Sequence, residues 1–206
     1  MSGHTWQALA TAVSSENDGA AMPAQVSVRG TIEIAARVAG ALTIAACVVA
    51  VVVNVALAAA ARRWLAFPFA RIPARPGEAV AIFRHNIRAL SAVGGLLLVV
   101  QSRYWPGRKN GARLHRAIRR GGEALLGATV CANVIVVGAS LGAYGTRMVR
   151  AVLPHGPVEL GAYALALALY LEARDRPLPV GHALAVLALS ISLLALAAVL
   201  ETFVKV

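Results

Sequence analysis

The stretch Leu153-Pro154-His155-Gly156-Pro157-Val158-Glu159 interrupts an apolar region of the chain and is followed directly by the apolar run from Leu160 to Leu171. Its prolines and glycine break a helix, whereas the Ala- and Leu-rich run after it favours one. A histidine and a glutamate four residues apart therefore stand where an apolar helix begins. Ionisable groups are costly to place in a bilayer, so His155 and Glu159 are the first candidates for a functional site.

The composition is that of an integral membrane protein. Of the 206 residues, 59% are hydrophobic and only 14% are charged, whereas about a quarter of the residues in a soluble domain are charged. We therefore predict an all-α transmembrane bundle of about five helices, in which the helix at 148–173 is broken. Residues 1–31 are expected to form a flexible polar tail, and residues 32–203 a single transmembrane domain. Apolar blocks long enough to cross a bilayer lie near 34–61, 79–100, 124–143, 148–172 and 180–200.

The net charge of +11 comes from 20 lysines and arginines against 9 acidic residues. Most of these basic residues lie between the apolar blocks, as is typical of loops that set topology and meet anionic lipid headgroups. The sequence contains no nucleic-acid-binding motif, so we expect the lipid bilayer, and no nucleic acid, as the partner of these charges. The chain is predicted to be a multi-pass protein of the cell membrane.

The most basic segment runs from Gln101 to Gly122, and its charge predicts a cytoplasmic location. With about five spans, the N-terminus is then cytoplasmic and the C-terminus lies outside. The four arginines of the segment 62–75 fall outside in this orientation and argue against it. Within the basic segment, Leu114, Ala117 and Ile118 predict a short amphipathic helix on the membrane surface. A docking patch for an acidic partner is the alternative.

Small residues inside the apolar blocks bear on helix packing. Gly138 and Gly142 have the GxxxG spacing that lets two helices approach closely. Cys47 and Cys131 each lie within an apolar block, and we expect them to pack as small buried hydrophobes. No CxxC, HExxH, Ser/His/Asp set or Gly-rich phosphate loop is present, so we predict no metal and no cofactor.

Several stretches follow one another in the order of a known family pattern. Pro154 to Glu159 has the form PHGxxE, and Asn86 precedes Gly94-Gly95 in the second block. Asn133 precedes Gly138 in the third block, and Ala197 to Phe203 gives an Ala-rich ending that contains Glu201. Residues 79–203 thereby resemble the stage II sporulation protein M family of polytopic bacterial membrane proteins. Pro157 stands where that family usually carries an aliphatic residue.

The resemblance implies two roles. The first is a scaffold that organises wall hydrolases and their membrane partners, so we expect other membrane proteins as partners in a hetero-oligomeric complex. The second is a subunit of a maturation, export or immunity system for a ribosomally synthesised peptide, of circular bacteriocin or linaridin type, which would take a peptide substrate. In neither role is the chain expected to be an enzyme on its own.

Two interpretations of His155 and Glu159 remain open from the sequence. In the structural one, Pro157 begins a helix and Glu159 stabilises its first turn by ~0.3–1 kcal/mol, while His155 bonds nearby backbone. In the functional one, the two side chains meet Glu201 or Asn133 in a water-accessible cavity and exchange protons or bind substrate.

Asn86 and Arg88 belong to a second polar cluster, in the first turns of the block at 79–100. One interpretation is an interfacial turn with snorkelling arginines. The other is that Asn86 and Arg88 bond Glu159 or Glu201 across the bundle, which would offset the cost of burying those carboxylates.

Overall fold

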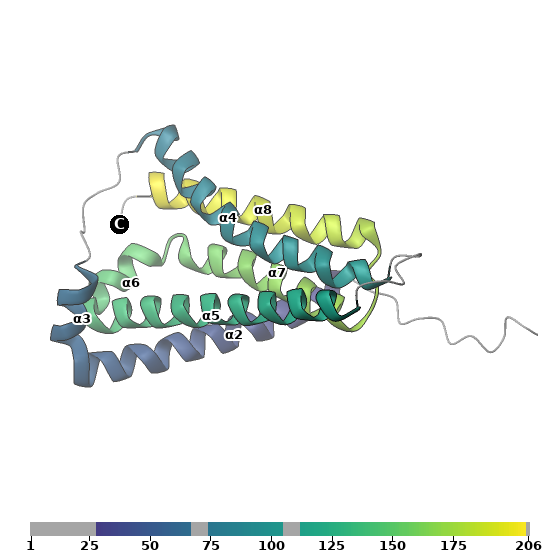
Figure 1. The fold of residues 1–206 in the computed structure, drawn as a ribbon. Coiled ribbons are helices and arrows are strands. Elements are labelled where there is room, and N and C mark those ends of the chain that lie inside the picture. The colour runs from purple at the N-terminus through teal and green to yellow at the C-terminus, as the bar shows by residue number, and fades with distance from the viewer. Residues whose placement is uncertain (1–27, 67–73, 105–111, 205–206) are drawn as a thin grey trace, which may run out of the picture.

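The computed structural model describes residues 28–66, 74–104 and 112–204, and Figure 1 shows how their helices are arranged. Every regular element in these ranges is helical, which confirms the all-α prediction. The elements are α2 (Val28–Val52), the π-helical turn η1 (Val53–Leu57), α3 (Ala58–Leu65), α4 (Pro76–Gln101), the 3₁₀ turn η2 (Ser102–Tyr104), α5 (Ala112–Tyr144), α6 (Thr146–Val152), α7 (Gly156–Asp175) and α8 (Val180–Phe203).

Four helical stretches of the described chain are long and apolar enough to cross a membrane: Val28–Leu65, Pro76–Tyr104, Arg113–Tyr144 and Val180–Phe203. The pair formed by α6 and α7 is a fifth candidate span, bent by 65° at its break. The break falls at 153–155, inside the stretch whose prolines and glycine predicted it. A helix broken at 148–173 is thus confirmed.

Two predicted boundaries differ from the structure. Residues 1–27 of the predicted tail lie outside the described residues, but 28–31 form the first turn of α2, where Thr31 is buried. The basic residues from Arg113 onward form the first turns of the long helix α5 and do not form a separate surface helix. The reason is that Arg, Leu, Ala and His all favour or tolerate a helix, so nothing between 112 and 120 ends it.

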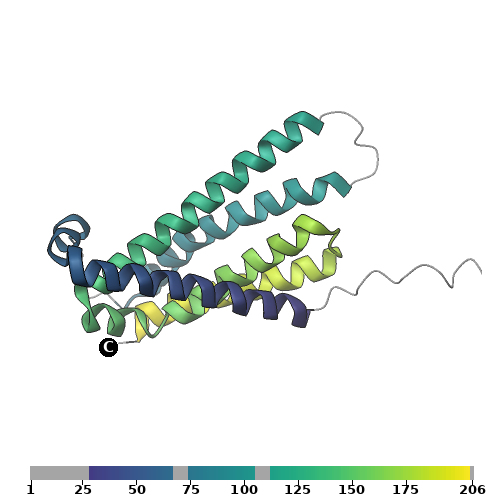
Figure 2. The same cartoon turned by 90° about the horizontal axis from the view of Figure 1, so that it is seen from below.

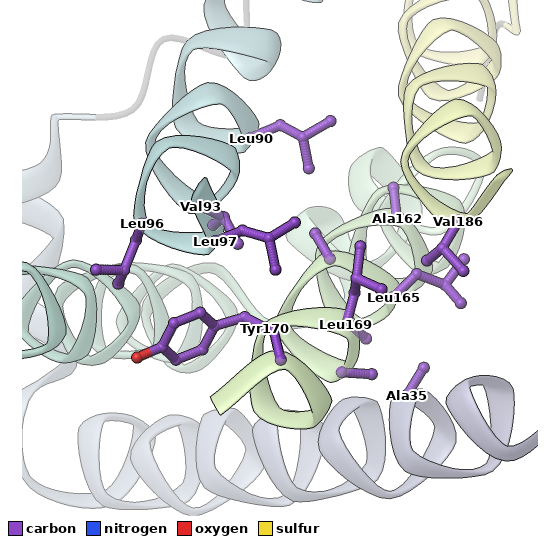
Figure 3. Packing of buried hydrophobic residues seen from close by; sticks show 14 of the residues in the cluster. Ala35, Leu90, Val93, Leu96, Leu97, Ala162, Leu165, Leu169, Tyr170 and Val186 are labelled. Atoms are coloured by element: carbon purple, nitrogen blue, oxygen red, sulfur yellow. The ribbon is translucent and has the colours of Figure 1, made fainter. Parts of the chain in front are cut away.

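Helix α7 is the central element of the bundle and contacts α2, α4 and α8 (Figure 1). Its alanines let these neighbours approach closely. Close packing of small residues holds helices together in a membrane, because lipid chains are as apolar as the side chains and burial alone gives no driving force. Leu169 of α7 and Leu194 of α8 are fully buried. Figure 3 shows this core, whose labelled members are Ala35, Leu90, Val93, Leu96, Leu97, Ala162, Leu165, Leu169, Tyr170 and Val186.

A second contact joins α2 to α5. A Cβ on Gly138 would lie 2.6 Å from the carbonyl oxygen of Ala46, and one on Gly142 would lie 2.3 Å from that of Ala50. Neither position can hold a side chain without a shift of the backbone, so the close approach expected of the GxxxG spacing is confirmed. From this contact the two helices diverge toward their N-terminal ends, as Figure 2 shows.

The expectation for the cysteines is wrong. Cys47 of α2 and Cys131 of α5 are both free and exposed. A thiol is apolar enough to face acyl chains, and a spanning helix is apolar on every side. The sequence pattern therefore does not distinguish the face that packs from the face that meets lipid.

Candidate functional site

A pocket of about 390 Å³ lies at the end of the bundle that contains the break between α6 and α7 and the C-terminal end of α8. It brings together four residues singled out in the sequence, from three separate helical segments: Asn86 of α4, His155 and Glu159 at the start of α7, and Glu201 of α8. The remaining lining residues are Ala81, Ile82 and His85 of α4.

The break between α6 and α7 positions His155 and Glu159. His155 precedes α7 as its N-cap, Gly156 is the first helical residue, and Pro157 follows in the first turn, where a residue without an N–H fits. The N–H of Glu159 donates to the carbonyl oxygen of His155 at 3.0 Å. A Cβ on Gly156 would lie 2.4 Å from Cγ1 of Val152, so only glycine lets the chain fold back this tightly on α6.

Helix α4 supplies the opposite wall of the pocket. Asn86 is buried, whereas Arg84 and Arg88 on the same helix are exposed. The hydroxyl of Tyr163 in α7 donates to the backbone oxygen of Asn86 at 3.2 Å, which ties the two walls together. The polar first turns of α4 therefore divide their side chains between the protein interior and the surroundings.

The carboxylates of the pocket differ from Glu123 and Glu172 in their partners. Glu123 and Glu172, also in apolar helices, each have arginine partners. Within the described ranges, Glu159 and Glu201 have neither a cationic partner nor a side-chain hydrogen bond, and they lie close enough to repel each other when both are ionised. Partly buried carboxylates without a partner are costly. The pocket is thus suited to a group that carries positive charge and N–H donors.

The structure does not bring Arg88 or Asn133 to this pocket. Positions 86 and 88 point to nearly opposite sides of a helix, so burying Asn86 turns Arg88 outward. Asn133 is exposed on α5, which does not line the pocket, and its amide donates to Thr129 within the same helix at 2.9 Å. The expected bond from Asn86 or Arg88 to Glu159 or Glu201 is not formed among the described residues.

The capping interpretation also differs from the observed geometry. His155 makes no side-chain cap hydrogen bond at the start of α7. Both side chains line the pocket instead. The helix dipole still favours a carboxylate at Glu159, but the position of His155 is explained by the chain break and its backbone bonds, and not by a side-chain cap.

Sequence reasoning missed a second polar cluster, at the opposite end of α7. The Thr31 hydroxyl donates to Oε2 of Glu172 at 2.8 Å and lies 3.0 Å from Nε2 of His182, and Nη2 of Arg176 donates to the other oxygen of Glu172 at 3.0 Å. The short turn between α7 and α8 was the available signal, because it makes Glu172 and His182 neighbours across a helical hairpin. Thr31 belonged to the predicted tail and gave no such signal.

Metal binding finds no support in the described part of the chain, where no three His, Cys, Asp or Glu side chains converge on one point. The two histidines and two glutamates of the pocket are spread along its walls. Comparison with known proteins adds no identity: no protein family, no curated protein and no solved structure matches this chain.

Proposed function

We propose that the protein is an integral membrane component of a multiprotein membrane complex, of the stage II sporulation protein M type, and that it recruits a partner through the pocket around Glu159 and Glu201. The observation that carries this proposal is the pair of carboxylates that has no countercharge. Because Glu123 and Glu172, which also lie in apolar helices, are paired with arginines, the missing countercharge distinguishes Glu159 and Glu201 from those two carboxylates.

An arginine or lysine of the partner supplies the missing charge. Charge-assisted hydrogen bonds to a carboxylate are about twice as strong as neutral ones, and a guanidinium can bond both carboxylates at once. The amide of Asn86 and the imidazoles of His85 and His155 offer further hydrogen-bonding groups around the same space. The partner is therefore a protein that presents a basic side chain at the membrane end where this pocket opens.

A second candidate is a subunit of a membrane-embedded maturation, export or immunity system for a ribosomally synthesised peptide. The observation that favours it is the joint presence of His155 and Glu159 in an open pocket, which fits acid–base work or binding of a peptide substrate. In this role the carboxylates meet the peptide instead of a scaffolded partner.

Site-specific photocrosslinking in the native host membrane tests the proposal. A photoreactive residue at Ile82, inside the pocket, is expected to give a defined protein adduct, whereas the same residue at Val136 on the outer face of α5 is not. Glu159→Gln and Glu201→Gln should each strongly reduce the adduct at Ile82 while the protein still unfolds at its normal temperature. Adduct yield that is unchanged in both variants would contradict recruitment through this pocket.

His155→Ala separates the two candidates. In the scaffold role, this variant keeps most of the adduct because both carboxylates remain. In the peptide role, the adduct is a short peptide, and His155→Ala abolishes production of the mature peptide while the precursor still crosslinks. Mass spectrometry of the adduct identifies which of the two species is bound.

A further inference from the structure

We propose that an anionic phospholipid occupies the groove between α2, α5 and α7, with an acyl chain along the groove and its phosphate at Arg119 and Arg174. The groove has a volume of about 360 Å³ and involves none of the residues of the Glu159 pocket. Its lining includes Val38 of α2, Glu123, Gly127 and Val130 of α5, and Tyr170 and Arg174 of α7.

The shape of the groove follows from the way α2 and α5 diverge. At Gly142 the two helices touch, because a Cβ added there would lie 2.3 Å from the carbonyl oxygen of Ala50. A Cβ added at Gly127 would meet nothing within 4 Å. Figure 2 shows the wedge that opens between the helices in this direction. Because the walls between Val38 and Val130 are apolar, the space fits a hydrocarbon chain and not water.

At the polar end of the groove, arginine N–H donors lack hydrogen-bond acceptors in the described part of the chain. The Tyr170 hydroxyl donates to Oε1 of Glu123 at 2.8 Å, and Nε of Arg119 and Nε of Arg174 lie 3.8 and 3.7 Å from the same oxygen. Both arginine distances exceed a hydrogen bond. Nε of Arg119 is moreover shielded from solvent and has no hydrogen-bond partner among the described residues.

Two guanidinium groups thus share one carboxylate, which leaves a net positive charge and unused N–H donors. Phosphate oxygens are strong acceptors for such donors, and arginine can bond them in a bidentate way. Arg113, Arg116 and Arg120 continue the basic surface along the same helix. This surrounding charge favours an anionic headgroup over a zwitterionic one.

Native mass spectrometry of the full-length protein in detergent tests the proposal. Phosphatidylglycerol is expected to remain bound about fivefold more than phosphatidylcholine with the same acyl chains, the ratio that roughly one additional favourable charge contact gives. Inorganic phosphate alone should leave the unfolding temperature unchanged, because it lacks the acyl chain. Equal retention of both lipids, or equal stabilisation by phosphate, would overturn the lipid assignment.

Matched variants locate the site. Gly127→Leu fills the groove and should abolish the preference for phosphatidylglycerol, while Gly95→Leu, on an exposed and open face of α4, should keep it. Arg174→Gln should likewise reduce retention, whereas Arg84→Gln, exposed on α4 and outside the groove, should not. Retention of phosphatidylglycerol at the normal level by both Gly127→Leu and Arg174→Gln would place the lipid elsewhere.

Discussion

Gly142 of α5 lies so close to Ala50 of α2 that an added Cβ would stand 2.3 Å from the Ala50 carbonyl oxygen. At this point the backbone of α5 is thereby packed directly on the backbone of α2. This contact fixes the crossing point of α2 and α5, from which the two helices diverge (Figure 2). The groove at their other end depends on it.

The first prediction concerns this contact. Gly142→Ala should lower the free energy of unfolding by about 1–3 kcal/mol, because the methyl group forces the backbones apart. Gly95→Ala is the matched control, since a Cβ there meets nothing within 4 Å. It should leave stability unchanged or raise it by up to about 1 kcal/mol. Unfolding in mixed detergent micelles measures both, and a loss of similar size in the two variants would contradict the argument.

The second prediction concerns the buried cluster of Thr31, Glu172 and His182. Thr31→Val should lower the free energy of unfolding by about 1–3 kcal/mol, because Glu172 loses a 2.8 Å hydrogen bond and His182 loses a partner in a buried place. Thr129→Val removes a hydroxyl that bonds only its own helix on an exposed face, and should change stability by no more than about 0.5 kcal/mol. Equal effects in the two variants would show that the cluster does not stabilise the bundle.

The third prediction concerns the break between α6 and α7. Gly156→Ala should displace α6 and distort the Glu159 pocket, because the new methyl group would lie 2.4 Å from Cγ1 of Val152. Adding Val152→Ala removes that atom and should restore crosslinking from Ile82. A double-mutant cycle on adduct yield measures the coupling. Additive losses would mean that Val152 is not the group that requires glycine.

The fourth prediction concerns orientation in the membrane. With the N-terminus cytoplasmic, Thr146 lies outside and Asp175 lies inside, since they are at opposite ends of the broken span. In a Cys47→Ala, Cys131→Ala background, we expect an impermeant maleimide to label Thr146→Cys in intact cells and Asp175→Cys only after permeabilisation. The reverse pattern would place the N-terminus outside.

Part of the candidate site could be predicted from residue types alone. His155, Glu159, Asn86 and Glu201 were recognisable because each is a polar group in or beside an apolar block. Arg88 and Asn133 satisfied the same criterion, yet one points away from the bundle interior and the other faces outward from α5. His85 also lines the pocket, although Asn86 and Arg88 were the members of its polar cluster for which a role was predicted.

The sequence by itself determined that the chain is an all-α membrane bundle, and that a helix breaks at Pro154 to Pro157, because chain length, apolarity and backbone restriction are local properties. Only the tertiary structure decided which faces pack and which meet lipid, because a spanning helix is apolar all round and its periodicity carries little of that information. The tertiary structure thus left Cys131 exposed and joined Thr31 to Glu172, which is 141 residues away in the sequence. It also brought Glu201 and Glu159 to one pocket without a countercharge.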